Sequence, residues 1–95
     1  MKFEWDQEKN LINQKKHKIS FETAAYVFQD KNYIEMYDFE HSTEEDRYIA
    51  IGCVGEVLFV VFTERKENIR LISARLATES ERRKRSVAGR ILSLV

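Results

Sequence analysis

The sequence contains one cysteine, two histidines and three glycines, and these small numbers exclude several kinds of chemistry. Cys53 has no second cysteine with which to form an intramolecular disulfide bond. One cysteine and two histidines cannot assemble a structural zinc site, and the acidic residues between positions 35 and 46 lack the spacing of a calcium loop. The glycines, at positions 52, 55 and 89, do not follow the spacing of a phosphate-binding loop. We therefore expect a protein that needs no metal ion, nucleotide or other cofactor.

The sequence also lacks a long apolar segment. No run approaches the roughly 18 residues of a membrane-spanning helix, and the first residues, MKFEWDQEK, do not resemble the apolar core of a signal peptide. With 95 residues, 43% hydrophobic and 34% charged, the chain has the composition of one globular unit. These features predict a cytoplasmic protein with a single domain over residues 1–95.

Although the net charge is zero, the charges are segregated along the chain. Residues 65–90 contain nine Lys and Arg but three Asp and Glu, whereas residues 33–46 contain six acidic residues and no Lys or Arg. A local excess of positive charge attracts a phosphate backbone even when the net charge is zero. The alternative is that the two segments neutralise each other in the folded protein.

The pattern of apolar residues predicts an α+β fold, with a small antiparallel sheet of about four to five strands, two N-terminal helices and one C-terminal helix. Asp6, Ser20 and the pair Thr78 and Glu81 are typical helix N-terminal caps. The run Val57–Phe62 suits a central strand buried on both faces. The expected elements are strands at 3–5, 33–40, 47–54, 57–62 and 69–74, and helices at 6–17, 21–30 and from 78 onward.

Three arginines lie on the hairpin predicted around residues 66–68. Arg65 ends its first strand, while Arg70 and Arg75 lie on the second. Guanidinium groups on a rigid sheet suit an oxyanion such as phosphate, although solvated edge arginines would give the same pattern. With a three-residue loop Arg65 would pair with Ile69, which would leave Arg65 and Arg75 about 20 Å apart. A loop one residue shorter or longer would place them on opposite faces, so the sequence leaves their arrangement open.

The remaining side chains suit the cleavage of RNA without a metal ion. In that reaction the 2′-hydroxyl of the substrate is the nucleophile, and the protein supplies a base, an acid and cations. His17 is a candidate proton carrier, or it caps the carbonyl end of its helix. Lys16 is a base or phosphate contact, or is simply solvated. Glu22 is a proton acceptor, or an acid that stabilises the start of its helix.

Three sequence strings resemble the BrnT family of toxins. They are KHKISFE at residues 16–22, RLISAR at residues 70–75 and ATESERR at residues 77–83, within a similarity that spans residues 3–83. The resemblance implies a RelE-like ribonuclease toxin of a type II toxin-antitoxin system. It also implies a small BrnA-like antitoxin as partner, which would block the toxin and bind operator DNA. Lys18 replaces a glycine common in the family, and Lys84, Arg85 and Ser86 stand where many members have a tyrosine.

The candidate site residues divide into two groups. For catalysis we expect Arg65 and Arg75 to stabilise the charge of the transition state, together with Lys16, His17 and Glu22. For RNA binding the candidates are Arg47, Arg70, Arg82 and Arg83, where Arg47 could instead pair with Glu45. The C-terminal helix is expected to turn its basic residues, Arg85 included, toward solvent. An alternative function is a non-catalytic module that binds nucleic acid or an antitoxin through this helix.

Overall fold

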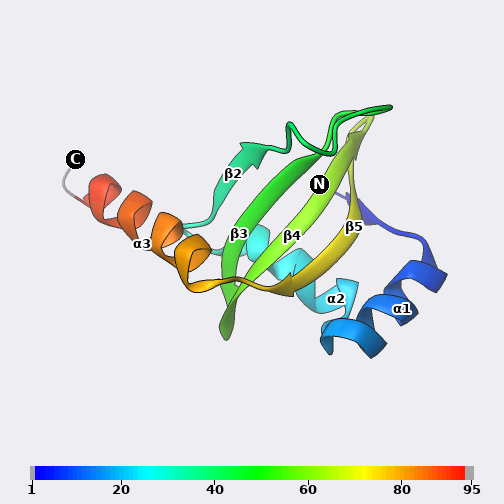
Figure 1. Ribbon diagram of the computed structural model, residues 1–95, viewed down its shortest axis with the longest axis horizontal. Helices are drawn as coiled ribbons and strands as arrows, with labels where there is room; N and C mark the ends of the chain where they lie inside the picture. The colour runs from blue at the N-terminus through cyan, green and yellow to red at the C-terminus, as the bar shows by residue number, and fades with distance from the viewer. Residues whose placement is uncertain (1, 94–95) are drawn as a thin grey trace.

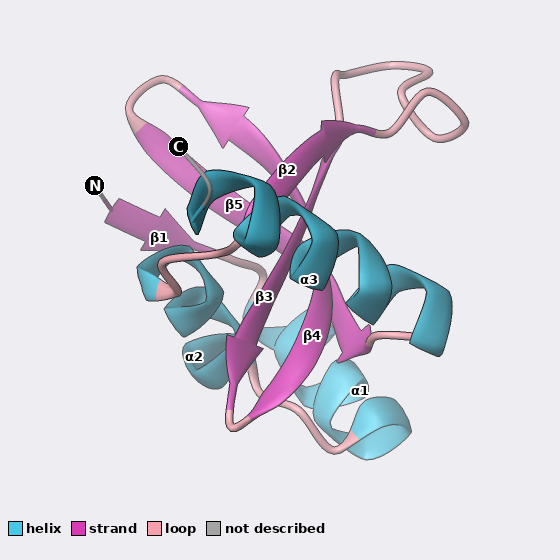
Figure 2. Cartoon of the chain, turned by 90° about the vertical axis from the view of Figure 1, so that its left-hand side faces the viewer, coloured by secondary structure: helices cyan, strands magenta, loops and turns pink. Residues whose placement is uncertain are grey.

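In the computed structural model the backbone is described for residues 2–93 and the side chains for residues 2–88. A five-stranded sheet has helices on both faces (Figures 1 and 2). The elements are β1 (Lys2–Glu4), α1 (Gln7–His17), α2 (Phe21–Ala24), the 3-10 helix η1 (Ala25–Gln29), β2 (Ile34–Tyr37), β3 (Tyr48–Val54), β4 (Glu56–Arg65), β5 (Asn68–Leu76) and α3 (Glu79–Ser93). Within residues 2–93 no helix is both long enough and apolar enough to cross a membrane.

The strands lie in the order β1-β5-β4-β3-β2, so β4 is the central strand, as its apolar run predicted. The α+β fold class is confirmed. One pairing differs from the expected antiparallel sheet, because β1 pairs parallel with β5 while the other neighbours are antiparallel. The chain passes through helices and three strands between β1 and β5, and a long connection of this kind permits a parallel pair.

The two faces of the sheet are covered to different extents. Helices α1 and α2 and the 3-10 helix η1 pack on one face, which we call the core face, and α3 lies against the opposite, outer face (Figure 2). Leu58, Val60 and Phe62 on the core face of β4 are buried, whereas Phe59 and Val61 on the outer face are half-buried. The prediction that β4 is buried on both faces is therefore wrong, because α3 covers only part of the outer face.

The helix predicted over residues 21–30 is a four-residue α-helix, α2, followed by the tighter η1. Within η1, Val27 is fully buried and packs directly on Gly52 of β3. A Cβ atom on Gly52 would lie 2.8 Å from the carbonyl oxygen of Val27 and 2.9 Å from its Cβ. The missing side chain of Gly52 therefore allows this close contact between η1 and the sheet.

Replacing Gly52 with alanine is expected to destabilise the protein by about 1–3 kcal/mol, because the new methyl group meets backbone rather than a movable side chain. Chemical denaturation measures the change. The control is Gly55→Asn in the open turn between β3 and β4, where φ is +72° and asparagine is tolerated; it should cost less than about 1 kcal/mol. Equal costs for the two variants would contradict the close packing.

Two buried asparagines attach helix α1 to its neighbours, Asn13 to strand β5 and Asn10 to helix α2. The side chain of Asn13 accepts a hydrogen bond from the Ala74 N–H (3.1 Å) and donates to the Ala74 carbonyl (2.9 Å), beyond the point where β1 stops pairing with β5. Asn10, which is fully buried, accepts from the N–H of Phe21 at 2.8 Å. These amides satisfy backbone groups that would otherwise be buried without partners.

The predicted helix caps are confirmed. The Asp6 carboxylate accepts from two N–H groups at the start of α1, and the Ser20 hydroxyl accepts from the Thr23 N–H at the start of α2. Thr78 and Glu81 form a reciprocal capping box, in which each side chain accepts from the backbone N–H of the other. The caps depend only on residues close in sequence, which is why the sequence predicts them well.

Candidate active site

A β-bulge in β5 decides the direction of the hairpin arginines. Arg70 and Arg75 are five residues apart, an odd separation that would place them on opposite faces of a regular strand. Val61 pairs with Ser73 but Phe62 pairs with Leu71, so Ile72 is an extra residue that reverses the alternation of faces beyond it. Both arginines therefore lie on the outer face.

Arg65 lies on the same face, at the end of β4. Its register partner is Asn68, so the hairpin turn is the two residues Lys66 and Glu67, with Lys66 at φ 57°. The three-residue loop considered from the sequence is therefore wrong. Arg75 pairs with Phe59, six residues before Arg65 on β4, which corresponds to about 20 Å. The two arginines share a face but cannot hold the same phosphate.

Each hairpin arginine is paired with a carboxylate. Arg65 contacts Glu45 at 3.1 Å, with side chains 50% and 39% exposed. Arg70 contacts Glu4 of the neighbouring strand β1 at 2.7 Å. Because exposed ion pairs contribute little net free energy, Arg65 could exchange Glu45 for a phosphate. The Arg65–Glu45 pair also joins the basic segment to the acidic one, so the charged segments do neutralise each other at this point.

Arg75 is held more firmly than Arg65. Its guanidinium lies over the Phe59 ring, 3.8 Å from the centroid, and donates to both carboxylate oxygens of Glu81 at 2.8 and 3.0 Å. Those bonds lower the pKa of Glu81 to about 2, and they raise the pKa of Arg75. Since Glu81 also caps α3, Arg75 connects the end of β5 to the start of that helix.

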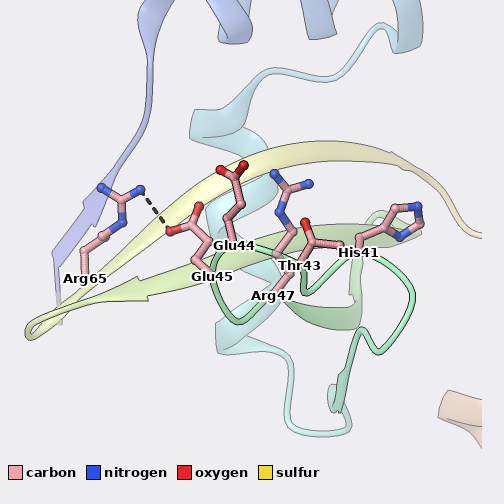
Figure 3. Close-up of a pocket in the computed structure, with 6 residues that line it drawn as sticks. All are labelled: His41, Thr43, Glu44, Glu45, Arg47 and Arg65. Carbon is pink, nitrogen blue, oxygen red and sulfur yellow. Dashed lines mark hydrogen bonds and ion pairs between the residues drawn. The ribbon is translucent and has the colours of Figure 1, made fainter.

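Arg65 lines a hollow of about 320 Å³ between the end of β4 and the loop that joins β2 to β3 (Figure 3). We call it the loop pocket. The side chain of Arg47 lies between those of Glu44 and His41 (Figure 3). Its guanidinium forms no hydrogen bond or ion pair with another described side chain. The predicted alternative that Arg47 pairs with Glu45 is not found, because Glu45 binds Arg65. The lining residues are His41, Thr43, Glu44, Glu45, Arg47 and Arg65.

His41 is oriented by a buried carboxylate. Its Nδ1 lies 3.0 and 3.1 Å from the two oxygens of Asp38, which is 7% exposed, whereas the His41 side chain is 62% exposed. Ser42 holds the loop closed by donating to the Asp38 carbonyl and accepting from the Arg47 N–H. The carboxylate fixes one ring nitrogen and leaves Nε2 available for proton transfer.

Sequence reasoning missed His41. The sequence predicts a strand at 33–40 followed by a polar, acidic loop, and none of the predicted site residues lies between positions 33 and 46. The signal that could have identified it is an aspartate three residues before a histidine in a short loop between strands, a spacing that brings the two side chains together.

The other predicted catalytic residues lie away from the loop pocket. Lys16 and His17 are in the last turn of α1, one turn beyond the Asn13 bond to β5, and Glu22 is in α2 on the core face. Glu22 accepts a hydrogen bond from Asn10 at 2.9 Å. Among the described side chains none of the three is hydrogen-bonded to a hairpin arginine. Their catalytic roles stay predictions.

The basic residues of α3 differ in their surroundings. Arg82 and Arg83 are exposed, as expected, and Arg83 forms an exposed ion pair with Glu79 one turn earlier. The prediction that Arg85 faces solvent is wrong. Arg85 binds Asp30 through two hydrogen bonds of 2.6 and 3.0 Å, with side chains 19% and 8% exposed, and this lowers the pKa of Asp30 to about 2. The pair fixes α3 to the segment before β2.

A mixed sheet with guanidinium groups on its outer face, beside a loop that offers an oriented imidazole, defines a small α+β protein suited to a phosphodiester substrate. The chain belongs to the family of BrnT, the ribonuclease toxin of type II toxin-antitoxin systems, which it matches over residues 5–81. It is therefore an endoribonuclease toxin with RNA as its substrate and an antitoxin as its partner.

A solved structure supports the assignment. The chain is similar to the crystal structure of the Brucella abortus ribonuclease toxin BrnT, with 26% sequence identity and a TM-score of 0.61. The similarity covers 83% of this chain and 99% of the Brucella chain. No curated protein matches the chain significantly.

Proposed function

We propose that this toxin cleaves RNA without a metal ion and that the reaction takes place in the loop pocket. The observation that carries the proposal is that one imidazole and two guanidinium groups line the same hollow, with a buried carboxylate behind the imidazole. These are the groups that a metal-free reaction requires: a proton-transfer group and fixed positive charge beside the phosphate.

In the proposed reaction the 2′-oxygen of a ribose attacks the adjacent phosphorus, and the bond from phosphorus to the 5′-oxygen breaks. The products carry a 2′,3′-cyclic phosphate and a 5′-hydroxyl. One proton leaves the 2′-hydroxyl and another reaches the departing 5′-oxygen. We assign these transfers to His41 and Glu44, because Glu45, the other carboxylate of the pocket, is paired with Arg65. Arg47 and Arg65 would stabilise the charge that develops on the phosphate oxygens.

The outer face extends this site along the sheet. Arg70 and Arg75 would contact phosphates farther along the same RNA strand, because they share a face with Arg65 over about 20 Å. The exposed Arg82 and Arg83 of α3 lie beyond Arg75 and would lengthen the positive track. The arrangement suits a single strand rather than one isolated phosphate.

The finer identity of the partner is also a proposal. We infer that the antitoxin is a small BrnA-like protein, that it carries the operator-binding activity, and that the pair acts in the cytoplasm. The toxin would then reach operator DNA only through the antitoxin. Family membership supports this assignment, and expression with and without the neighbouring short gene tests it: growth should stop only without that gene.

Purified toxin in EDTA is expected to produce RNA fragments with 2′,3′-cyclic phosphate and 5′-hydroxyl ends, because the positive charge in the pocket comes from arginine side chains. Mass spectrometry of the fragments identifies the ends. If cleavage stops in EDTA and returns with Mg²⁺, the metal-free mechanism is refuted. If no cleavage occurs in either condition, the alternative of a non-catalytic binding module is favoured instead.

Replacing Glu45 with glutamine is expected to raise the affinity for RNA by about two- to fivefold at low salt, since an exposed ion pair of up to about 1 kcal/mol no longer competes for Arg65. Fluorescence anisotropy with an uncleavable 2′-O-methyl RNA measures the change. Glu40→Gln is the control, because Glu40 is an exposed acid of the same loop that does not line the pocket. An equal gain for both variants would show a general charge effect and no specific competition at Arg65.

A further inference from the structure

A second hollow lies on the core-face side of the molecule, away from the loop pocket. It has a volume of about 350 Å³. It lies between the start of the chain, from β1 to the segment before α1, and the exposed side of α2 and η1. We call it the aromatic hollow. Its lining residues are Phe3, Trp5, Glu22, Ala25, Tyr26 and Gln29. Neither the proposed cleavage reaction nor the RNA track uses any of these side chains.

The carboxylate of the aromatic hollow is held in place by a buried side chain. Asn10 is 0% exposed, and its oxygen is fixed by the N–H of Phe21 and by Gln14. Its amide nitrogen is thereby directed at Oε1 of Glu22, at 2.9 Å. Oε2 of Glu22 has no hydrogen-bond partner among the described residues. The hollow thus presents an oriented carboxylate with one free oxygen.

The walls beside this carboxylate are aromatic. Trp5 packs edge-on against Phe21, and its indole N–H donates to Gln7, so the ring is fixed. Tyr26 is 57% exposed, so its ring is accessible to a partner at the edge of the hollow. Aromatic rings with a single carboxylate favour a cation that is planar and partly apolar, since its faces contact the rings while its N–H groups donate to the carboxylate.

We propose that the aromatic hollow binds an arginine side chain presented by the antitoxin. A guanidinium can donate to Oε2 of Glu22 and lie against the aromatic walls at once, whereas a lysine offers only a point charge and a leucine leaves the carboxylate unpaired. Aromatic and arginine side chains commonly anchor protein interfaces, which fits an exposed Tyr26. Because the hollow is on the side of the molecule away from the loop pocket, the contact would hold the partner without itself occupying the nuclease site.

Binding in the hollow can be followed by tryptophan fluorescence, because Trp5 lines the hollow and is the one tryptophan of the chain. The peptide Ac-Gly-Arg-Gly-NH2 is expected to produce a saturable change in Trp5 fluorescence. The same peptide with citrulline, a neutral analogue of arginine, should bind the wild-type toxin about tenfold more weakly. The arginine peptide should bind Glu22→Gln toxin about tenfold more weakly as well, because each change removes a charge-assisted hydrogen bond. Glu8→Gln is the matched control, an exposed acid in the first turn of α1 that lies outside the hollow. Equal binding of arginine and citrulline peptides, or no effect of Glu22→Gln, would overturn the proposal.

The partner is tested with the full-length antitoxin. Tyr26→Ala toxin is expected to bind antitoxin about tenfold more weakly by isothermal titration calorimetry while it cleaves RNA at the wild-type rate. Thermal unfolding verifies that the variant is folded. Unchanged antitoxin affinity would reject the hollow as a contact with that partner. A wrong cleavage mechanism would be recognised separately. It would change the RNA-cleavage results of wild-type and Tyr26→Ala toxin equally, and it would not change the binding of the peptide or the antitoxin.

Discussion

Alanine substitutions at His41 and Arg65 are each expected to lower the rate of RNA cleavage by at least about 100-fold. For Arg65→Ala the expected loss is about 100- to 1,000-fold, the usual effect of removing one donor to a developing oxyanion. For His41→Ala the range is about 100- to 10,000-fold, because a positioned proton-transfer group is lost. Single-turnover cleavage of a labelled RNA measures both rates, and growth arrest on expression provides the cellular readout.

The chain offers a matched comparison for His41, since it has two histidines. His17, at the end of α1, is the proton carrier predicted from the sequence, whereas His41 is the one that the loop pocket contains. The His17→Ala variant should therefore cleave RNA much faster than His41→Ala. The reverse order would move the reaction to the end of α1. Full activity of Arg65→Ala would remove the loop pocket from the mechanism altogether.

Replacing Asp30 with alanine is expected to destabilise the protein by about 3 kcal/mol, because it leaves the largely buried guanidinium of Arg85 without its partner. Asp30 also accepts from the N–H groups of Cys53 and Asn32, and these bonds would be lost as well. For a domain of this size the change corresponds to a fall in Tm of roughly 10–20 °C. Differential scanning calorimetry measures it directly.

The exposed ion pair of the same helix provides the control for Asp30. Glu79 pairs with Arg83 at 2.8 Å, but their side chains are 70% and 73% exposed. Glu79→Ala should therefore change the free energy of unfolding by less than about 0.5 kcal/mol. If the two substitutions had the same effect, the Asp30–Arg85 pair would not be what fixes α3 to the rest of the domain.

Several features of this protein depend on residues close in sequence, and these could be predicted. The caps formed by Asp6, Ser20 and Thr78 with Glu81 involve neighbours one turn apart. The apolar run in β4 identifies the central strand, although its outer-face residues are only half-buried. The motif strings indicated the BrnT family, which the match over residues 5–81 confirms.

The candidate site was harder to predict, because the residues that line it are far apart in the sequence. Arg65 lies on the sheet surface at the end of its strand, but His41 and Arg47, which line the same pocket, come from a loop about 20 residues earlier. Arg85 was assigned to solvent because a run of basic residues is usually solvated, and Asp30, 55 residues earlier, is the partner that buries it. No local sequence pattern indicates that Arg65 shares a pocket with the loop residues or that Arg85 pairs with Asp30.

The sequence by itself indicated the family, through the resemblance of its motif strings, and it determined the α+β class, the helix caps and the central strand, which follow from local spacing and side-chain type. The tertiary structure decided which arginines share a face, because the extra residue Ile72 in β5 reverses the alternation and a bulge has no dependable local signature. It also decided which histidine lines the same pocket as Arg47 and Arg65. Both outcomes depend on strand register and loop closure, which are set by the packing of the whole domain rather than by any one segment.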